Sequence, residues 1–322
     1  MVEQANTWND LISYALIVNN EDDVTLFKKF SRLWHCEPNL AMRVSVHLVW
    51  PKSPFQSGCQ FDILVKEWRK LNSSVNCSAD GGKEADKREL RRSDPFIGVY
   101  PINVMRNVAR KGAPTNLHLV ADIENFFSEN FAKIVRNFTK ILVNASDKNR
   151  HVLVFRRFEV EAGVKFPRSV KQLAQLYENN RAVEFHSRFF SEGHHIPGLD
   201  KWFNYSLREG TQVKTWELGY NRSTWEPQLI MRGDAPYHFE QIPTRVQDHQ
   251  VLANELCRAS HKFYLLSHVF NAHRGIKQSF TPVEKVVSEA GKVNARAIIP
   301  TFNAYLDSKY PDTKGKCPTI NV

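Results

Sequence analysis

The feature of this sequence that most constrains its fold is an alternation of apolar runs and amphipathic stretches across the first 141 residues. Residues 11–18 are largely apolar, which is typical of a strand buried on both faces of a sheet. Asp22 and Asp23 then stand where a helix begins, and large apolar side chains follow at helical spacing. Repeated units of this kind predict an α/β fold with a mostly parallel central sheet and helices on both faces. Further strands are expected at 44–50, 95–100 and 117–121, and further helices at 61–71, 101–112 and 128–141.

The rest of the chain is less regular. Strands are expected at 151–155 and 263–266, and helices at 169–177 and 251–259. Residues 72–92 combine two glycosylation sequons, a Gly-Gly pair and a dense charge run, so we expect a long exposed loop there. With 322 residues, of which 42% are hydrophobic, the chain is long enough for one large α/β domain or two small ones.

The formal net charge of +10 raises the question of an anionic partner. The basic residues lie in runs of mixed sign, such as residues 83–92, and this pattern is typical of a solvated loop. No aromatic RNA-binding strand and no zinc-finger spacing accompanies them. An anionic small molecule or polysaccharide fits a diffuse positive field, and we predict no nucleic-acid partner.

The cysteines and the glycosylation sequons give information on the cellular compartment of the protein. The five cysteines include no C-x-x-C pair, which argues against a zinc cluster and leaves two interpretations open, up to two disulfides or five reduced thiols. No apolar run approaches the roughly 20 residues that a spanning helix needs, and no signal peptide is visible. Six Asn-x-Ser/Thr sequons favour a glycosylated, lumenal protein. They begin at Asn72, Asn76, Asn137, Asn144, Asn204 and Asn221.

Two acidic residues, Asp122 and Glu124, follow an expected strand. Residues i and i+2 of a strand point to the same side, so both carboxylates can reach one cation. Oxygen ligands at the carboxyl end of a strand suit Mg²⁺ or Mn²⁺ holding a nucleotide diphosphate. Downstream, His273 offers a nitrogen ligand, Gly275 permits close backbone approach to a phosphate, and Lys277 can neutralise it. The alternatives are a helix cap with a surface charge, and a surface histidine beside two ordinary cations.

A third cluster contains Glu226, between Trp225 and Pro227, and Asp234 eight residues later. An acid held beside a tryptophan can have its pKa raised toward the range of a general base, and an aromatic face suits a sugar ring. A structured loop with a half-buried tryptophan is the alternative. The sequence contains no phosphate-binding P-loop, dinucleotide fingerprint, serine-hydrolase elbow or zinc-protease motif.

These clusters belong to a longer series of motifs in fixed order along residues 95–317. In chain order the series is Tyr100-Pro101-Ile102-Asn103, Arg106-Asn107-Val108-Ala109, Asp122-Ile123-Glu124, Phe158-Glu159-Val160-Glu161, Pro167-Arg168, Trp225-Glu226-Pro227, Asp234-x-Pro236, His273-x-Gly275-x-Lys277, and Lys309-Tyr310-Pro311 followed by Cys317. It resembles the signature region of the family-49 glycosyltransferases, which include glucuronyltransferases of α-dystroglycan glycosylation. The first 94 residues match mainly in their strand–helix layout.

The resemblance implies a GT-A type fold, a UDP-sugar donor, Mn²⁺, and a type II membrane protein of the Golgi lumen. It implies that Asp122, Glu124 and His273 bind the metal and that Gly275 and Lys277 lie against the diphosphate.

By the same resemblance, Arg106 would meet an anion of the donor. One catalytic domain is expected over 1–322. Its nucleotide-sugar half is 1–125, ending at the Asp-x-Glu motif. Its acceptor half is 126–322, with the C-terminal metal and diphosphate segment.

Three departures from the family pattern stand out. Glu124 replaces the usual second aspartate, and its extra methylene moves the carboxylate by about one bond length, which a rotamer change or a water can absorb. Residues 243–250 differ from the family and leave the acceptor open. The membrane anchor expected by family is absent from this sequence, which is read as truncated at its N-terminus or as a secreted variant.

We therefore expect an inverting transfer of glucuronic acid from a UDP-sugar to a glycan hydroxyl, with Glu226 or Asp234 as the base. The alternatives are transfer of N-acetylglucosamine from UDP-GlcNAc, a non-catalytic glycan-binding relative in which Glu124 has degraded the metal site, and a metal-dependent hydrolase that uses the same ligands. An oligomer is compatible with the sequence.

Overall fold

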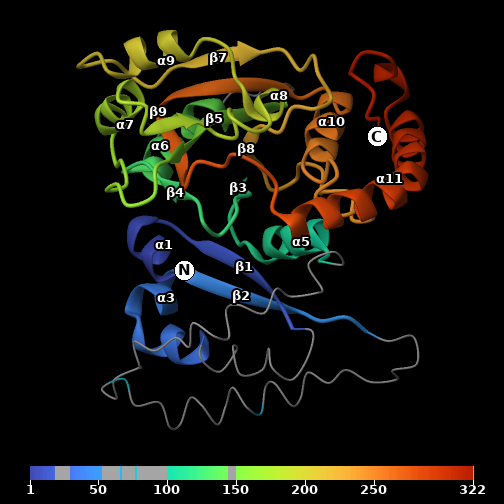
Figure 1. Ribbon diagram of the computed structural model, residues 1–322, viewed down its shortest axis with the longest axis horizontal. Helices are drawn as coiled ribbons and strands as arrows, with labels where there is room; N and C mark the ends of the chain where they lie inside the picture. The colour runs from blue at the N-terminus through green and yellow to red at the C-terminus, as the bar shows by residue number, and fades with distance from the viewer. Residues whose placement is uncertain (19–29, 53–65, 67–76, 78–99, 144–149, 322) are drawn as a thin grey trace.

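The structure is a computed structural model that describes residues 1–18, 30–52, 66, 77, 100–143 and 150–321, with the backbone alone at 140–143 (Figure 1). The described helices are α1 (Val2–Thr7), α3 (Pro38–Arg43), α5 (Ile102–Gly112), α6 (Phe131–Val143), α7 (Val170–Glu178), α8 (Ser191–His194), α9 (Leu199–Ser206), α10 (Gln250–Arg258) and α11 (Pro282–Lys309), which a 3₁₀ turn follows (Pro311–Thr313). The described strands are β1 (Ile12–Ile17), β2 (Val44–Val49), β3 (Leu117–Leu119), β4 (Phe126–Phe127), β5 (His151–Val160), β6 (Ala182–Glu184), β7 (Thr215–Leu218), β8 (Gln228–Arg232) and β9 (Lys262–Arg274).

The N-terminal part forms a small sheet of two parallel strands. β1 and β2 pair with Ile12 opposite Val44. α5 packs against both strands, and the hydroxyl of Ser13 donates a 2.7 Å hydrogen bond to the carbonyl of Ala109 on that helix. The small sheet therefore lies against α5 (Figure 1). Three predicted elements are confirmed here, at 11–18, 44–50 and 101–112.

The large sheet contains the other seven strands in the order β3-β8-β5-β9-β4, with β6 beside β5 and β7 beside β9. Among the strands that the structure describes, only β5 and β9 pair in parallel in this sheet, and its other pairs are antiparallel. The prediction of a mostly parallel central sheet is therefore corrected to a mixed sheet. The prediction extended the regular first half to the whole chain. The large sheet is built mainly from the second half, where several strand neighbours are antiparallel and need no helical crossover.

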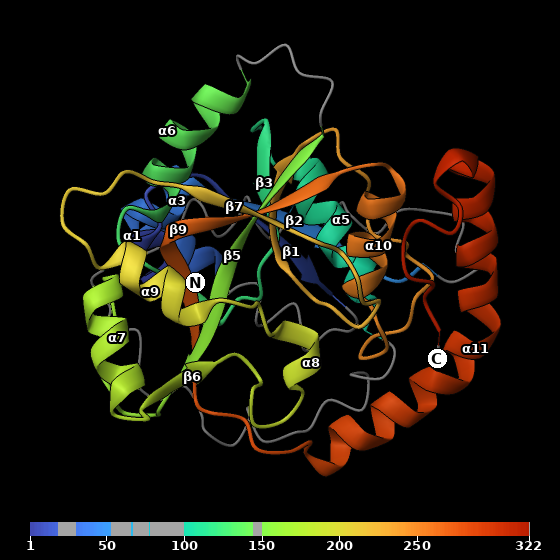
Figure 2. The same cartoon turned by 90° about the horizontal axis from the view of Figure 1, so that it is seen from above.

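The strand β5 shows how helices come to cover both faces of the large sheet, as predicted. Its side chains alternate, so Val152, Val154 and Phe158 face a core shared with α7, α9 and α10. Leu153 and Phe155 face the opposite side and pack with α6. Helix α6 therefore packs on one face of β5 and α7 and α9 on the other, and Figure 2 shows β5 crossing the middle of the molecule.

Some sequence predictions fall outside the described residues. The helix expected at 61–71, the loop at 72–92 and the strand at 95–100 lie there except for isolated positions. Of the sequon asparagines, Asn137 and Asn221 are exposed, as is Asn204, whereas the other three lie outside the described residues. Among the helices that are described, none is both long and apolar enough to cross a membrane.

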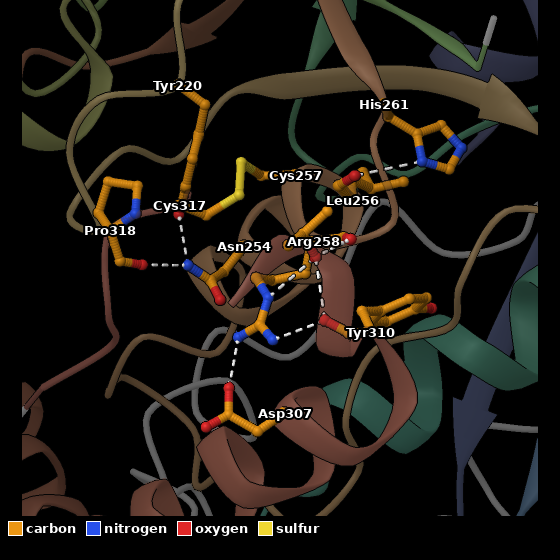
Figure 3. The surroundings of a disulfide bond; sticks show 11 residues. Tyr220, Asn254, Leu256, Cys257, Arg258, His261, Asp307, Tyr310, Cys317 and Pro318 are labelled. Atoms are coloured by element: carbon orange, nitrogen blue, oxygen red, sulfur yellow. Dashed lines mark hydrogen bonds and ion pairs between the residues drawn. A yellow bond between two sulfur atoms is a disulfide. The ribbon is translucent and has the colours of Figure 1, made fainter. Parts of the chain in front are cut away.

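Two disulfides are present, which decides between the two interpretations of the cysteines. Cys36 is bonded to Cys77, and Cys257 is bonded to Cys317. The second bond fastens the C-terminal tail to α10 (Figure 3). The same junction contains Arg258, whose guanidinium donates to Asp307 at 2.9 Å and to the carbonyl of Tyr310 at 3.0 Å.

We expect that replacing Cys257 and Cys317 together by alanine lowers the free energy of unfolding by about 2–4 kcal/mol. The bond joins residues 60 positions apart, and without it the unfolded chain regains the freedom of that loop. Urea denaturation of the oxidised proteins measures the difference. Under reducing conditions the parent and the double variant should unfold at the same urea concentration. Equal midpoints in the oxidised proteins would contradict the bond.

Candidate functional site

A cavity of about 1480 Å³ is lined by residues of β1, of α5 and of the large sheet. Its walls include the carboxyl ends of the parallel neighbours β5 and β9, where ligands bind in α/β folds. The cavity is larger than the roughly 300–1,000 Å³ of ordinary small-molecule sites, so an extended ligand fits. Of the predicted site residues, those that line it are Arg106, Asp122, Glu124, Glu226, His273 and Lys277.

The same alternation that builds the core places charged groups at this cavity. Beyond Phe155 the residues of β5 that face away from the large core are Arg157 and Glu159, and both line the cavity. On β9, Ala272 lies in the core and its neighbour His273 lines the cavity. The face of the sheet that α6 covers at Leu153 and Phe155 therefore carries charged residues toward the end of β5, where it lines the cavity.

Asp122 was predicted to stand at the carboxyl end of a strand, but in the structure it lies in a turn. β3 ends at Leu119, and a turn follows in which the amide of Asn125 donates to the carbonyl of Asp122 at 3.1 Å. The carboxylate of Asp122 accepts a 2.8 Å hydrogen bond from Arg157. Burial by itself would raise the pKa of Asp122, but Arg157 and Arg106 outweigh it and hold this pKa well below its usual value.

Glu124 and His273 lie together, with Nε2 of the histidine 3.9 Å from a carboxylate oxygen of the glutamate. The other ring nitrogen, Nδ1, is 3.4 Å from the carbonyl oxygen of Gly275. A carbonyl only accepts, so a ring that carries its hydrogen on Nδ1 can donate to Gly275 and turn the lone pair of Nε2 toward a metal ion.

This donor set suits a divalent cation in its chemistry. The structure brings Glu124 and His273 together, while Asp122 pairs with Arg157. Among the described residues, no three His, Cys, Asp or Glu side chains are already arranged around one metal position. The three-ligand metal site therefore stays a prediction, and completing it requires Asp122 to exchange its arginine partner for the ion.

Lys277 points to the cavity and is held by three neighbours. Its ammonium is 2.8 Å from Glu284 and lies over the rings of Phe189 and Phe280 at 5.1 and 5.3 Å. Glu284 also pairs with Arg245 at 3.0 Å. One carboxylate thus positions two cations at the cavity wall, where both are available to an anionic ligand.

Gly275 is not among the lining residues of the cavity, but its backbone fits the predicted close approach. Its φ is +90°, which side-chain-bearing residues rarely adopt, and no atom lies within 4 Å of where a Cβ would stand. Its amide donates a 2.7 Å bond to the carbonyl of Val160, which fixes the loop after β9 to the end of β5.

Arg106 projects from α5 and donates to Asp248 at 2.6 Å and to Asn103 at 3.0 Å. Asp248 lies in the stretch 243–250 that departs from the family pattern, and it lines the cavity. Arg106 was predicted to contact an anion of the donor, and in the structure the anion beside it is the carboxylate of Asp248.

Glu226 and Asp234, the two candidates for the base, have different environments. Glu226 lines the cavity and is 26% exposed, and His194 approaches its carboxylate to 3.2 Å. Burial raises the pKa of Glu226 to about 8, helped by the negative charge of Asp248. Asp234 is 69% exposed, pairs with Arg232 at 3.0 Å, and is not among the residues that line the cavity.

His194 is nearly enclosed, and burial holds its pKa well below the ordinary value, so the ring is neutral and can donate to Glu226. The backbone ties the pair together, because the amide of Glu226 donates to the carbonyl of Gly193 at 2.6 Å.

Sequence reasoning missed several residues that line this site. A signal existed for two of them, since Arg157 and Glu159 interrupt an otherwise apolar strand. The others come from segments far apart along the chain, two of them from the helices α8 and α11, and only the fold brings them together. They are His194, Arg245, Asp248 and Glu284.

Comparison with known proteins places this geometry in context. The model of glycosyltransferase family 49, described as "Glycosyl-transferase for dystroglycan", matches residues 1–311. Beta-1,4-glucuronyltransferase 1 of Mus musculus and of Homo sapiens is 26% identical over 324 residues, covering 96% of this chain and 72% of theirs. The protein of the same name from Danio rerio is 27% identical over 316 residues, covering 96% and 70%.

Proposed function

Because the chain belongs to glycosyltransferase family 49, we propose that it transfers glucuronic acid from a UDP-sugar to a glycan hydroxyl, with inversion and with Mn²⁺. The strongest support is the place of Glu226, a carboxyl group with a pKa raised to about 8 in the same cavity as Asp122, His273 and Lys277. The candidate base and the side chains that could bind a diphosphate and its metal ion therefore line the same cavity.

In the proposed reaction Glu226, in its ionised form, takes the proton of the acceptor hydroxyl. The hydroxyl oxygen forms the new bond to the anomeric carbon while the bond from that carbon to the UDP oxygen breaks, and the electron pair leaves with UDP. Neutral His194, with Nε2 3.2 Å from the carboxylate of Glu226, would donate to it and hold it in place.

The leaving group develops negative charge, and Lys277 and Arg245 stand at the wall where they stabilise it. Asp122, Glu124 and His273 would hold Mn²⁺, and the ion, when bound, supplies further positive charge to the diphosphate.

The remaining parts of the proposal follow the family. We assign a GT-A type fold, with residues 1–125 as the nucleotide-sugar half and 126–322 as the acceptor half. Residues of both halves line the cavity, as expected of a space that holds the donor beside the acceptor. A Golgi-lumen location agrees with the two disulfides, which persist in oxidising compartments.

A donor screen tests the proposal. Purified protein is incubated with Mn²⁺, a panel of glycans and each UDP-sugar, and released UDP is measured. We expect release with UDP-glucuronic acid above all other donors. A preference for UDP-GlcNAc would overturn the donor assignment, and glycan binding without turnover of any UDP-sugar would identify a non-catalytic relative.

The exposed carboxylate provides the matched control for this site. Asp234→Asn should keep the kcat/KM of the parent within about twofold, because its partner is a surface arginine and it lies away from the cavity. A hundredfold lower kcat/KM in initial-rate assays would instead indicate that Asp234 is the base.

A further inference from the structure

The longest helix of the described chain, α11, carries two apolar faces. One face packs on the body of the protein through Ala295, Ile299, Phe302 and Leu306. The other is turned away from this core, and α11 itself lies at the edge of the molecule in both views (Figures 1 and 2). This second face, the α11 stripe, is exposed along its length. It consists of Val283, Val286, Ala290, Val293 and Ala297.

The spacing of the α11 stripe is that of a coiled-coil seam. Its members are separated by three, four, three and four residues, which is the repeat that keeps one line of side chains against a partner helix. Val286 is 69% exposed and Val293 is 66% exposed. Single exposed apolar residues need no explanation, but a continuous line of them on a well-formed helix does. The small side chains of Ala290 and Ala297 allow close approach of a second helix.

We propose that the α11 stripe binds the same stripe of a second copy of this chain, with the two helices antiparallel. The charges beside the stripe select this partner. Glu289 and Arg296 lie on one edge of it, seven residues apart, and both are exposed. When Ala290 faces Val293 of the partner subunit, the Glu289 side chain meets the partner's Arg296.

The two-fold axis repeats this contact with the roles exchanged, so one geometry forms two ion pairs. A parallel arrangement would bring Glu289 and Arg296 against the opposite edge of the partner helix instead. The residues of that edge are uncharged at Asn294 and Thr301. Charge complementarity therefore favours the antiparallel self-pair.

The local structure leaves these charges available. Within the described residues Arg296 forms no ion pair. Among those residues Glu289 pairs only with Lys292 of its own helix, at 2.7 Å, and the side chains of Glu289 and Lys292 are 71% and 45% exposed. An exposed pair of this kind is weak and can exchange partners. The capping box of Thr281 and Glu284 and the packing of Gly291 on Val246 hold the helix itself in place.

Sedimentation velocity of the whole chain over about 1–100 µM tests the proposal. We expect the parent to pass from a monomer of 37.2 kDa to a dimer within this range. Glu289→Arg and Arg296→Glu should each weaken the dimer at least about tenfold, because each places like charges at both contacts. Lys171→Glu reverses an exposed charge on α7, which lies at the opposite edge of the molecule from α11 in Figure 2, and should leave the dimer intact.

Mixing the two variants gives the sharpest result. Glu289→Arg in one copy faces Arg296→Glu in the other, so the mixture should form a heterodimer although each variant alone is monomeric. The double variant Glu289→Arg/Arg296→Glu should dimerise like the parent. A parent that stays monomeric at 100 µM, single reversals that dimerise as well as the parent, or a mixture that stays monomeric would each overturn the proposal. Unchanged thermal melting of the variants shows that each remains folded.

Discussion

Asp122→Asn should lower kcat/KM for sugar transfer by at least about a hundredfold and weaken Mn²⁺ binding. The substitution keeps the shape of the side chain but removes the charge that a divalent cation requires. Initial rates at several Mn²⁺ concentrations measure the first effect. The electron paramagnetic resonance signal of free Mn²⁺, with and without UDP, measures the second without any turnover.

The controls separate a metal ligand from a structural carboxylate. Asp122 has a lowered pKa, so its pair with Arg157 stabilises the folded state above the ordinary aspartate pKa, and this stability is lost as the pH falls. Asp122→Asn should therefore also lower the melting temperature near neutral pH. Arg157→Gln removes the same ion pair and keeps the carboxylate, so it should lower the melting temperature and retain Mn²⁺ binding. Unchanged Mn²⁺ binding by Asp122→Asn would contradict the assignment of the metal site.

Glu226→Gln should lower kcat by about 10²–10⁴-fold, the range that a positioned base contributes. The amide has nearly the same shape but cannot accept the proton of the acceptor hydroxyl. Binding of UDP and Mn²⁺, measured by calorimetry, should stay close to that of the parent. Full activity of Glu226→Gln would rule out this residue as the base.

The pH dependence provides an independent test of Glu226. Its pKa is raised to about 8, so the parent should gain kcat/KM as the pH rises toward 8 and the carboxyl group ionises. Glu226→Gln should lose this rising limb. A flat profile of the parent between pH 6 and 8 would contradict the assignment.

The effect on stability has the opposite sign to that of Asp122. Because the folded state holds the proton of Glu226 to a higher pH than the unfolded state does, stability falls as the pH rises from the ordinary glutamate pKa through 8. Glu226→Gln removes this loss, so the variant should melt at the same temperature as the parent or higher at pH 8–9. Thermal melts over this range measure the difference.

The sequence predicted the fold best where local pattern decides it. The strands β1 and β2 and the helix α5 form where apolar runs and helical spacing placed them. α11 was not predicted, although Thr281, Pro282 and Glu284 are the residues of a helix start. The order of the large sheet could not be predicted, because the position of β8 between β3 and β5 depends on pairing between distant segments.

The candidate site was predictable to a similar degree. Motif positions identified the groups Asp122, His273 and Glu226, which the fold does bring to one cavity. The partners that set their chemistry come from elsewhere in the chain. Arg157 lowers the pKa of Asp122 from a strand 35 residues away, and His194 reaches Glu226 from the end of helix α8. Such pairs leave no local pattern in a single sequence.

The anomeric configuration of the product shows whether the protein catalyses an inverting transfer of glucuronic acid. UDP-glucuronic acid is an α-linked donor, so inverting transfer by a base such as Glu226 yields a β-linked glucuronoside and one UDP per transfer. Proton NMR of the anomeric signals during the reaction, with Mn²⁺ and a glycan acceptor, distinguishes the two configurations. We predict a β-linked product that forms at the rate of UDP release. An α-linked product, or UDP-glucuronic acid left intact with every acceptor while UDP and Mn²⁺ bind, would contradict the account.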